Sequence, residues 1–284
     1  FLSLGAAAAY KYYSGLYHGI RGSIGVSMHI DGFKRKVMLD GVKLRPVFPA
    51  LYKYYDTNPI GSVRLTNSER FPVKDIEISV YSDKYMDKPK VCASPELLGP
   101  GETAEVALNA LFSKEVLSLI EGTKTAVTIS ARYTMNGVER KIEQVESLRL
   151  NNRNALTWDD DKKTAVFITA KDPELLKLSK LVAGMVRREK NAAFNLNMQI
   201  GIAMYEALRV YGLNYVVDPH TPAYSDASAD ASVIDYIQFP AETLNFRGGD
   251  CDDLSILYCS LLESVGIETA FITVPGHILT AFSL

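Results

Sequence analysis

The stretch FRGGDCDDLSILYCSLLESVGI, residues 246–267, decides the fold of the C-terminal part of this chain. Its apolar residues recur at intervals of three and four from Leu254 to Val265, which is the spacing of one face of an α-helix. Gly266 follows this run, and glycine often ends a helix because it adopts the left-handed conformation without strain. The sequence therefore predicts a helix that has Cys251 in its first turn and that Gly266 closes.

Cys251 occupies a chemically distinctive position in this predicted helix. At about 100° per residue it projects onto the middle of the apolar face. A thiol at a helix N-terminus meets unpaired N–H groups and the positive end of the helix dipole, and both favour the nucleophilic thiolate. Asp250, Asp252 and Asp253, which we expect to cap the helix, act against this because like charges raise the thiol pKa. A thiolate therefore requires a cation nearby.

A histidine follows at a suitable distance along the chain. Residues 268–274 predict a strand, Pro275-Gly276 a turn, and residues 277–282 a second strand that begins with His277. If the helix packs its Cys251 face on this sheet, Cys251 and His277 come within hydrogen-bond reach as a thiolate–imidazolium pair.

The run from Gly249 to Leu254, the helix, and Pro275-Gly276-His277 together resemble the core of the transglutaminase-like superfamily. This is the papain-like fold of transglutaminases and of bacterial transglutaminase-like cysteine proteases. The resemblance covers roughly residues 235–284, whereas residues 151–212 fit the helical part of that fold by position and type only. It implies thiol-dependent acyl transfer on protein or peptide amides, without a metal or other cofactor.

The resemblance also implies roles for individual residues. Cys251 corresponds to the nucleophile and His277 to the general base, while Gln238, upstream of the cysteine, corresponds to a donor of the oxyanion hole. The third member, an Asp or Asn on the strand after the histidine strand, has no counterpart before Leu284, so we expect the last strands of the domain to be missing. Protease or amidase activity is favoured over cross-linking, because the bacterial members resemble proteases more often.

Residues 23–150 show a different pattern, because apolar residues alternate with polar ones. Seven segments read as strands, separated by turn dipeptides such as Asp31-Gly32, Asp40-Gly41 and Asn136-Gly137. Short strands with such spacing predict an antiparallel, immunoglobulin-like β-sandwich. The segments lie near residues 25–30, 37–39, 62–66, 76–81, 104–108, 126–133 and 145–150, and residues 111–120 predict a short helix.

The remaining segments complete a two-domain prediction, an all-β sandwich followed by an α+β domain of the transglutaminase-like type. Asp172-Pro173 predicts a helix start, a second helix is expected at 193–210, and residues 218–231 read as a loop. Trp158, the only tryptophan, is expected to plug the joint between domains, with a calcium or ligand site as the alternative. The predicted boundaries are an N-terminal arm at 1–22, the sandwich at 23–150 and the α+β domain at 151–284.

Composition restricts the function further. The 284 residues include 31 Lys and Arg and 33 Asp and Glu, a formal net charge of -2, so no global positive field attracts nucleic acid. The three cysteines form no CxxC pair, which argues against a disulfide scaffold and a structural zinc site.

Two questions about the setting of the protein stay open. The apolar stretch from Phe1 to Ala9 reads as the tail of a removed secretory signal or membrane anchor, or as an ordinary helix. The first interpretation predicts a periplasmic or cell-envelope location, with the membrane contacted only through that anchor. Besides the enzyme, the sequence allows a catalytically incomplete interaction module that binds a cell-envelope protein through the β-sandwich.

Overall fold

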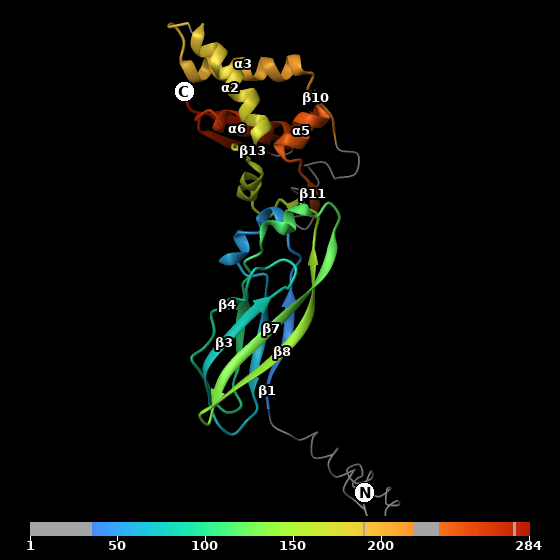
Figure 1. The fold of residues 1–284 in the computed structure, drawn as a ribbon, viewed down its shortest axis with the longest axis vertical. Coiled ribbons are helices and arrows are strands. Elements are labelled where there is room, and N and C mark those ends of the chain that lie inside the picture. Colours follow the sequence, from blue (N-terminus) through green and yellow to red (C-terminus); the bar gives the residue numbers. More distant parts are fainter. Residues whose placement is uncertain (1–35, 190, 218–232, 275–276) are drawn as a thin grey trace, which may run out of the picture.

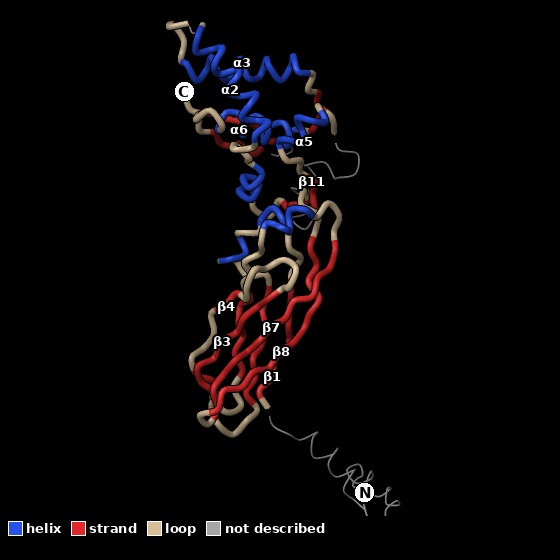
Figure 2. Tube along the Cα trace, in the orientation of Figure 1, coloured by secondary structure: helices blue, strands red, loops and turns tan. Residues whose placement is uncertain are grey.

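The computed structural model describes residues 36–189, 191–217, 233–274 and 277–284. A β-rich region is followed by an α+β region, and the two form the lower and upper parts of Figures 1 and 2. The expected arm at 1–22, the strand at 25–30, the turn at Asp31-Gly32, the loop at 218–231 and the turn at Pro275-Gly276 lie outside the described residues.

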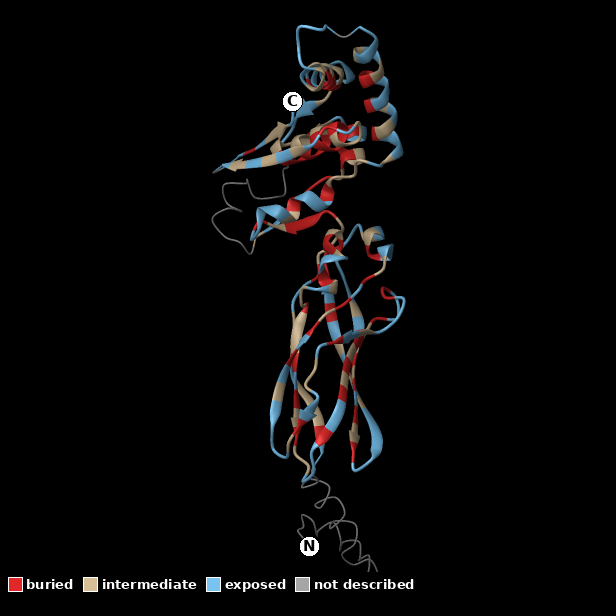
Figure 3. Ribbon diagram, turned by 90° about the vertical axis from the view of Figure 1, so that its left-hand side faces the viewer, coloured by how far each residue is buried: buried red, intermediate tan, exposed pale blue. Residues whose placement is uncertain are grey.

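Two antiparallel sheets make up the β-rich region. The two sheets share one buried core, to which Leu65 and Val106 contribute from one sheet and Ile78 and Ile129 from the other. Buried positions recur along the strands of the β-rich region (Figure 3). One sheet has the order β1 (Val37–Leu44), β2 (Gly61–Asn67), β6 (Thr103–Leu108). The other has the order β4 (Lys90–Cys92), β3 (Val73–Tyr81), β7 (Thr123–Met135), β8 (Val138–Leu150), and β5 (Leu97–Leu98) also pairs with β3.

The predicted turns differ in outcome. Asn136 and Gly137 have φ values of 52° and 76° and connect β7 to β8, so this hairpin turn is confirmed. The prediction of a turn at Asp40-Gly41 is wrong, because β1 continues through these residues with a register shift between Asp40 and Lys43. Gly41 has a φ of 60°, so the dipeptide forms a bulge within a strand.

Short 3-10 helices accompany the sheets. The helix expected at 111–120 is one 3-10 segment, η3 (Lys114–Ser118). The others are η1 (Pro49–Leu51), η2 (Tyr54–Asp56) and η4 (Asp161–Phe167).

The α+β region begins with two helices at the expected places. The Asp172 carboxylate accepts a hydrogen bond of 3.0 Å from the Glu174 N–H and so caps α2 (Pro173–Arg188). Asn195 caps α3 (Leu196–Tyr211), which ends at Gly212 with a φ of 91°. Two further helices are α5 (Pro240–Phe246) and α6 (Cys251–Glu263), and the strands pair as β10 (Asn214–Tyr215) with β12 (Gly248–Gly249), β9 (Ala155–Thr157) with β11 (Ile234–Tyr236), and β13 (Thr269–Val274) with β14 (His277–Phe282).

Helix α6 lies between two hydrophobic cores. Its Ile256 belongs to the core that extends from the β-rich region, together with Ile278 of β14. Leu257 and Leu261 belong to a second core with residues of α2 and α3. The predicted helix is therefore confirmed, but it is buried on more sides than a single apolar face provides.

Polar contacts hold the first residues of the α+β region against the segment from β11 to α5. Trp158 is buried in the core that the two regions share, and its indole N–H donates a hydrogen bond of 2.7 Å to the buried Asp235 carboxylate. The Asn154 amide donates to the Ile237 carbonyl at 2.8 Å and to Glu242, which also pairs with Arg153. The strand pairing of β9 with β11 adds backbone hydrogen bonds at the same place.

Within the described residues, no helix has the length and apolar character needed to span a membrane.

Candidate active site

A two-residue parallel strand pair holds the start of α6 in place. β12 pairs with β10, so Tyr215 lies opposite Gly249, and the Val216 N–H donates to the Gly249 carbonyl at 2.9 Å. Gly249 is required because a Cβ there would lie 2.6 Å from the Cβ of Asp253, on the first turn of α6. The glycine of the Gly-Asp-Cys motif thus lets the chain pass close to the helix that carries Cys251.

Cys251 is half-buried at the first position of α6, as predicted. Burial, the largest effect, and the charge of Asp250 raise the pKa of its thiol, while the backbone amides of Ile278, Cys251 and Asp252 lower it. The net pKa is raised, so the thiol is uncharged near neutral pH in this conformation. The helix terminus alone does not outweigh burial and the neighbouring acid.

His277 is the first residue of β14, and the next residue, Ile278, lies against the Cys251 sulfur. Ile278 is buried and Thr280 meets Cys259 of α6 at 3.6 Å, so this alternate set of β14 residues faces α6. His277 is exposed and belongs to the other set. Among the residues that the structure describes, no hydrogen bond joins the Cys251 thiol to the His277 imidazole, so that pairing stays a prediction and requires the imidazole to turn about the end of the strand.

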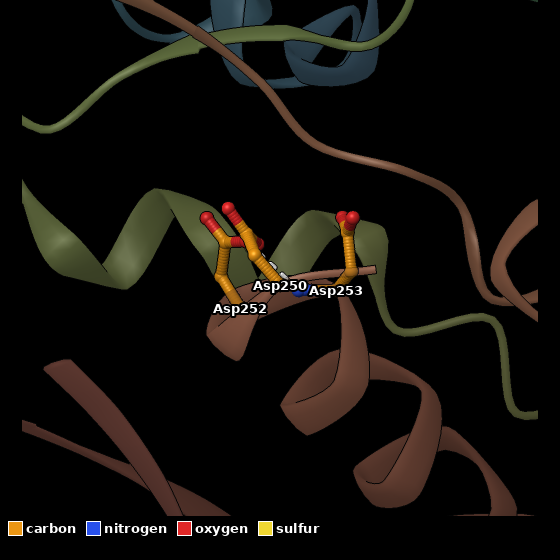
Figure 4. Close-up of side chains that lie close together, drawn as sticks. All are labelled: Asp250, Asp252 and Asp253. Carbon is orange, nitrogen blue, oxygen red and sulfur yellow. Dashed lines mark hydrogen bonds between the residues drawn. The ribbon is translucent and has the colours of Figure 1, made fainter. Parts of the chain in front are cut away.

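The three aspartates around Cys251 are not the helix caps that the sequence predicts. Asp250 occupies the N-cap position but its side chain makes no capping hydrogen bond. Asp252 and Asp253 are buried, and the Asp253 N–H donates to the Asp252 carboxylate at 2.8 Å (Figure 4). The reason is that the first turn of α6 faces the Gln238 segment instead of solvent.

The buried acids interact with one another. Burial raises the pKa of Asp252 well above its usual range, and a hydrogen bond with Asp250 and the charges of Asp250, Asp253 and Asp235 act in the same direction. Carboxylate oxygens of Asp250, Asp252 and Asp253 lie within 4.8 Å of one another, an arrangement of hard oxygen ligands that could hold a divalent cation. The absence of a metal from the reaction stays a prediction.

Gln238 has a different partner from the one its proposed role requires. Its backbone N–H and its side-chain amide donate to the Asp253 carboxylate at 2.7 and 2.6 Å, and the side chain is 6% exposed. Its amide group therefore holds Asp253 behind the start of α6. A role in an oxyanion hole stays a prediction that this hydrogen bond makes harder to fulfil.

Two residues of the site were missed from the sequence. Tyr215 reaches it through the pairing of β10 with β12, and the Cys251 and Asp250 charges raise the pKa of its hydroxyl after burial, the largest cause. Asp235 reaches it through β11 and contributes to the raised pKa of Asp252. Strands of two and three residues show no periodicity. The one signal for Asp235 is that a buried tryptophan N–H, here that of Trp158, needs an acceptor.

Neither the scan against protein-family models nor the search of curated proteins returns a match for this chain. Among solved structures, the chain is similar to the GAE domain of GGA2p from Saccharomyces cerevisiae, with 11% identity, a TM-score of 0.22 and coverage of 40% of this chain and 97% of that chain. It is also similar to a late embryogenesis abundant (LEA) protein, with 9% identity, a TM-score of 0.29 and coverage of 51% and 83%. A third is AggA, the major subunit of aggregative adherence fimbriae type I from Escherichia coli, with 10% identity, a TM-score of 0.20 and coverage of 42% and 94%. At these scores the likenesses carry no argument about function.

Proposed function

We propose that the protein catalyses thiol-dependent acyl transfer on protein or peptide amides, with Cys251 as nucleophile and His277 as base, and that hydrolysis is its main reaction. The observation that carries the proposal is the position of Cys251, half-buried at the first residue of α6 with the backbone of Ile278, the neighbour of His277, against its sulfur. A nucleophile at a helix N-terminus beside a histidine-bearing strand suits this chemistry.

The reaction proceeds in two steps. The Cys251 sulfur attacks the amide carbonyl carbon, His277 takes the thiol proton, and backbone N–H groups at Cys251 stabilise the oxyanion. The carbon–nitrogen bond then breaks, and the imidazolium gives its proton to the leaving amine, which leaves a thioester on Cys251. Water then attacks the thioester carbonyl with His277 as base. The carbon–sulfur bond breaks, the acid is released, and the imidazolium returns its proton to the Cys251 sulfur. A lysine amine in place of water gives a cross-link.

Approach of His277 is the step that activates the thiol. Burial and Asp250 raise the thiol pKa while His277 lies on the outer face of β14, so an imidazole that turns toward Cys251 supplies the cation that offsets both. We associate this turn with substrate binding, since a covered site strengthens the thiolate–imidazolium attraction.

The proposal extends to the fold and location of the protein. The two antiparallel sheets with a shared core are consistent with an immunoglobulin-like sandwich, and α6 with the β13–β14 hairpin is consistent with the centre of a papain-like domain. With these assignments the protein is a bacterial, periplasmic or cell-envelope hydrolase that acts on protein or peptide substrates.

Incubation with a peptide library tests the activity. New peptide N-termini, detected by mass spectrometry, report hydrolysis, and incorporation of an added primary amine reports cross-linking. We expect the intact chain to generate new N-termini and Cys251→Ala and His277→Ala to lose them, while Cys92→Ser, a buried thiol of the β-rich region, keeps them. Equal cleavage by Cys251→Ala, or no reaction by any variant, overturns the proposal.

A second candidate is the interaction module, in which the protein binds a cell-envelope partner through its β-sandwich and performs no catalysis. The exposed position of His277 on β14 and the raised pKa of the Cys251 thiol favour it. The same library experiment separates the two functions, because the interaction module leaves every peptide intact.

A further inference from the structure

A cavity of about 410 Å³ opens between α3, β10, α6 and β14. Its α6 wall consists of Leu254, Ser255 and Tyr258, and the first two lie one helical turn beyond Cys251. One turn of α-helix rises about 5.4 Å, and one residue of an extended peptide spans about 3.5 Å. The wall of the cavity therefore begins one to two peptide residues away from the thiol.

Two residues that line the cavity also lie near the Cys251 thiol. Tyr215 lines the cavity and lies opposite Gly249, and the Cys251 charge contributes to the raised pKa of its hydroxyl after burial. Ser255 also lines the cavity, and its hydroxyl donates to the Ile278 carbonyl at 3.4 Å. Because the Ile278 amide lies against the Cys251 sulfur, Ser255 of the cavity wall and the thiol contact the same residue of β14.

The lining is mainly apolar and aromatic. Leucines and tyrosine rings form most of it, and the Tyr258 hydroxyl is already used, since it donates to the Gly201 carbonyl at 2.7 Å. Among the described residues that line the cavity, Arg209 alone carries a charge, and Glu206 pairs with it at 2.6 Å. The leucines are Leu208, Leu213 and Leu254, and the tyrosines are Tyr205, Tyr215 and Tyr258.

We propose that this cavity binds a neutral apolar or aromatic side chain of the peptide substrate, such as leucine or phenylalanine, within two residues of the amide that Cys251 attacks. This inference rests on the proposed function of Cys251. A volume near the lower end of the range for ligand pockets accepts a side chain but not a folded partner. Arg209 is already paired with Glu206, so the lining offers an acidic or basic side chain little compensation for its lost hydration.

The proposal is tested by binding, without catalysis. Full-length Cys251→Ser, which has no thiol at the site, is titrated with N-acetylphenylalanine amide and, as matched ligand, N-acetylglycine amide, and methyl resonances are followed by NMR. We expect the phenylalanine ligand to shift the methyl resonances of Leu254 and Thr280 and to bind at least about tenfold more tightly than the glycine ligand, because burial of an aromatic ring supplies that difference.

Variants locate the binding. Ser255→Trp fills the cavity and should abolish the preference for phenylalanine, whereas Leu181→Trp adds the same ring on the outer face of α2, at a residue 62% exposed, and should retain it. Tyr205→Ala removes one wall at a residue 64% exposed, so a folded variant with weaker binding is expected even if Ser255→Trp does not fold.

Equal affinity for both ligands, or shifts confined to residues outside the cavity, overturn the proposal. Because Cys251→Ser carries out no acyl transfer, this failure is independent of the library experiment. Selective binding in the cavity together with a chain that cleaves nothing refutes the proposed activity alone.

Discussion

Gly249→Ala tests whether the close packing of Gly249 against Asp253 holds the start of α6 in place. The new Cβ would lie 2.6 Å from the Asp253 Cβ and 2.8 Å from its carboxylate oxygen, and the former is fixed by the helix backbone. Overpacking of this kind costs about 1–3 kcal/mol, and alanine returns about 0.4–1 kcal/mol by restricting the unfolded chain. We therefore expect a net loss of about 1–2 kcal/mol in the free energy of unfolding.

The neighbouring glycine supplies a matched control. A Cβ at Gly248 would meet a Val216 methyl carbon at 3.0 Å, and Val216 is 50% exposed, so its side chain can rotate away. Urea unfolding followed by the fluorescence of Trp158, the only tryptophan, compares the two variants. We expect Gly248→Ala to lie within about 0.5 kcal/mol of the unmodified chain, the usual range for open sites. If Gly249→Ala is equally stable, the reasoning about Asp253 is wrong.

Three further predictions concern the buried acids. Trp158→Phe removes the hydrogen bond to the buried Asp235 carboxylate, so we expect a loss of about 1.5–3 kcal/mol in urea unfolding followed by circular dichroism; an unchanged midpoint would contradict this. Asp252→Asn should stabilise the protein at neutral pH, because the raised pKa of Asp252 means that its charged form opposes folding. The gain in the free energy of unfolding should vanish toward acid pH, where Asp252 itself takes up a proton. A gain that does not depend on pH would contradict the raised pKa. Asp250→Asn should speed iodoacetamide alkylation of Cys251 near neutral pH, because the Asp250 charge raises the thiol pKa; a slower reaction would refute it.

The long elements could be predicted from the sequence because their signals repeat. Helix α6 shows the helical period over a dozen residues and closes at Gly266, which has a φ of 87°. The longer strands of the β-rich region have six or more residues, and Asn136-Gly137 marks the hairpin between the two longest. Asp40-Gly41 has the same turn chemistry but forms a bulge, because β1 pairs with β2 on both sides of it.

The surroundings of Cys251 could not be predicted in the same way. Acidic residues at a helix start ordinarily face water, and the burial of Asp252 and Asp253 depends on the segment around Gln238, which reaches them through tertiary packing. The approach of Tyr215 depends on a strand pair of two residues, which is too short to leave a pattern. The position of Cys251 on α6 follows from the local sequence, whereas the residues around it are brought there by tertiary packing.

The core on one side of α6 continues along the chain into the β-rich region. Within that core, Leu156 of β9 and Phe167 of η4 belong to elements that contact η1 of the β-rich region, so an α+β fragment cut after Leu150 would expose apolar surface at this end. Such a fragment would gain a surface prone to self-association. The β-rich region is therefore a structural cover for the end of the α+β region that β9 and η4 form.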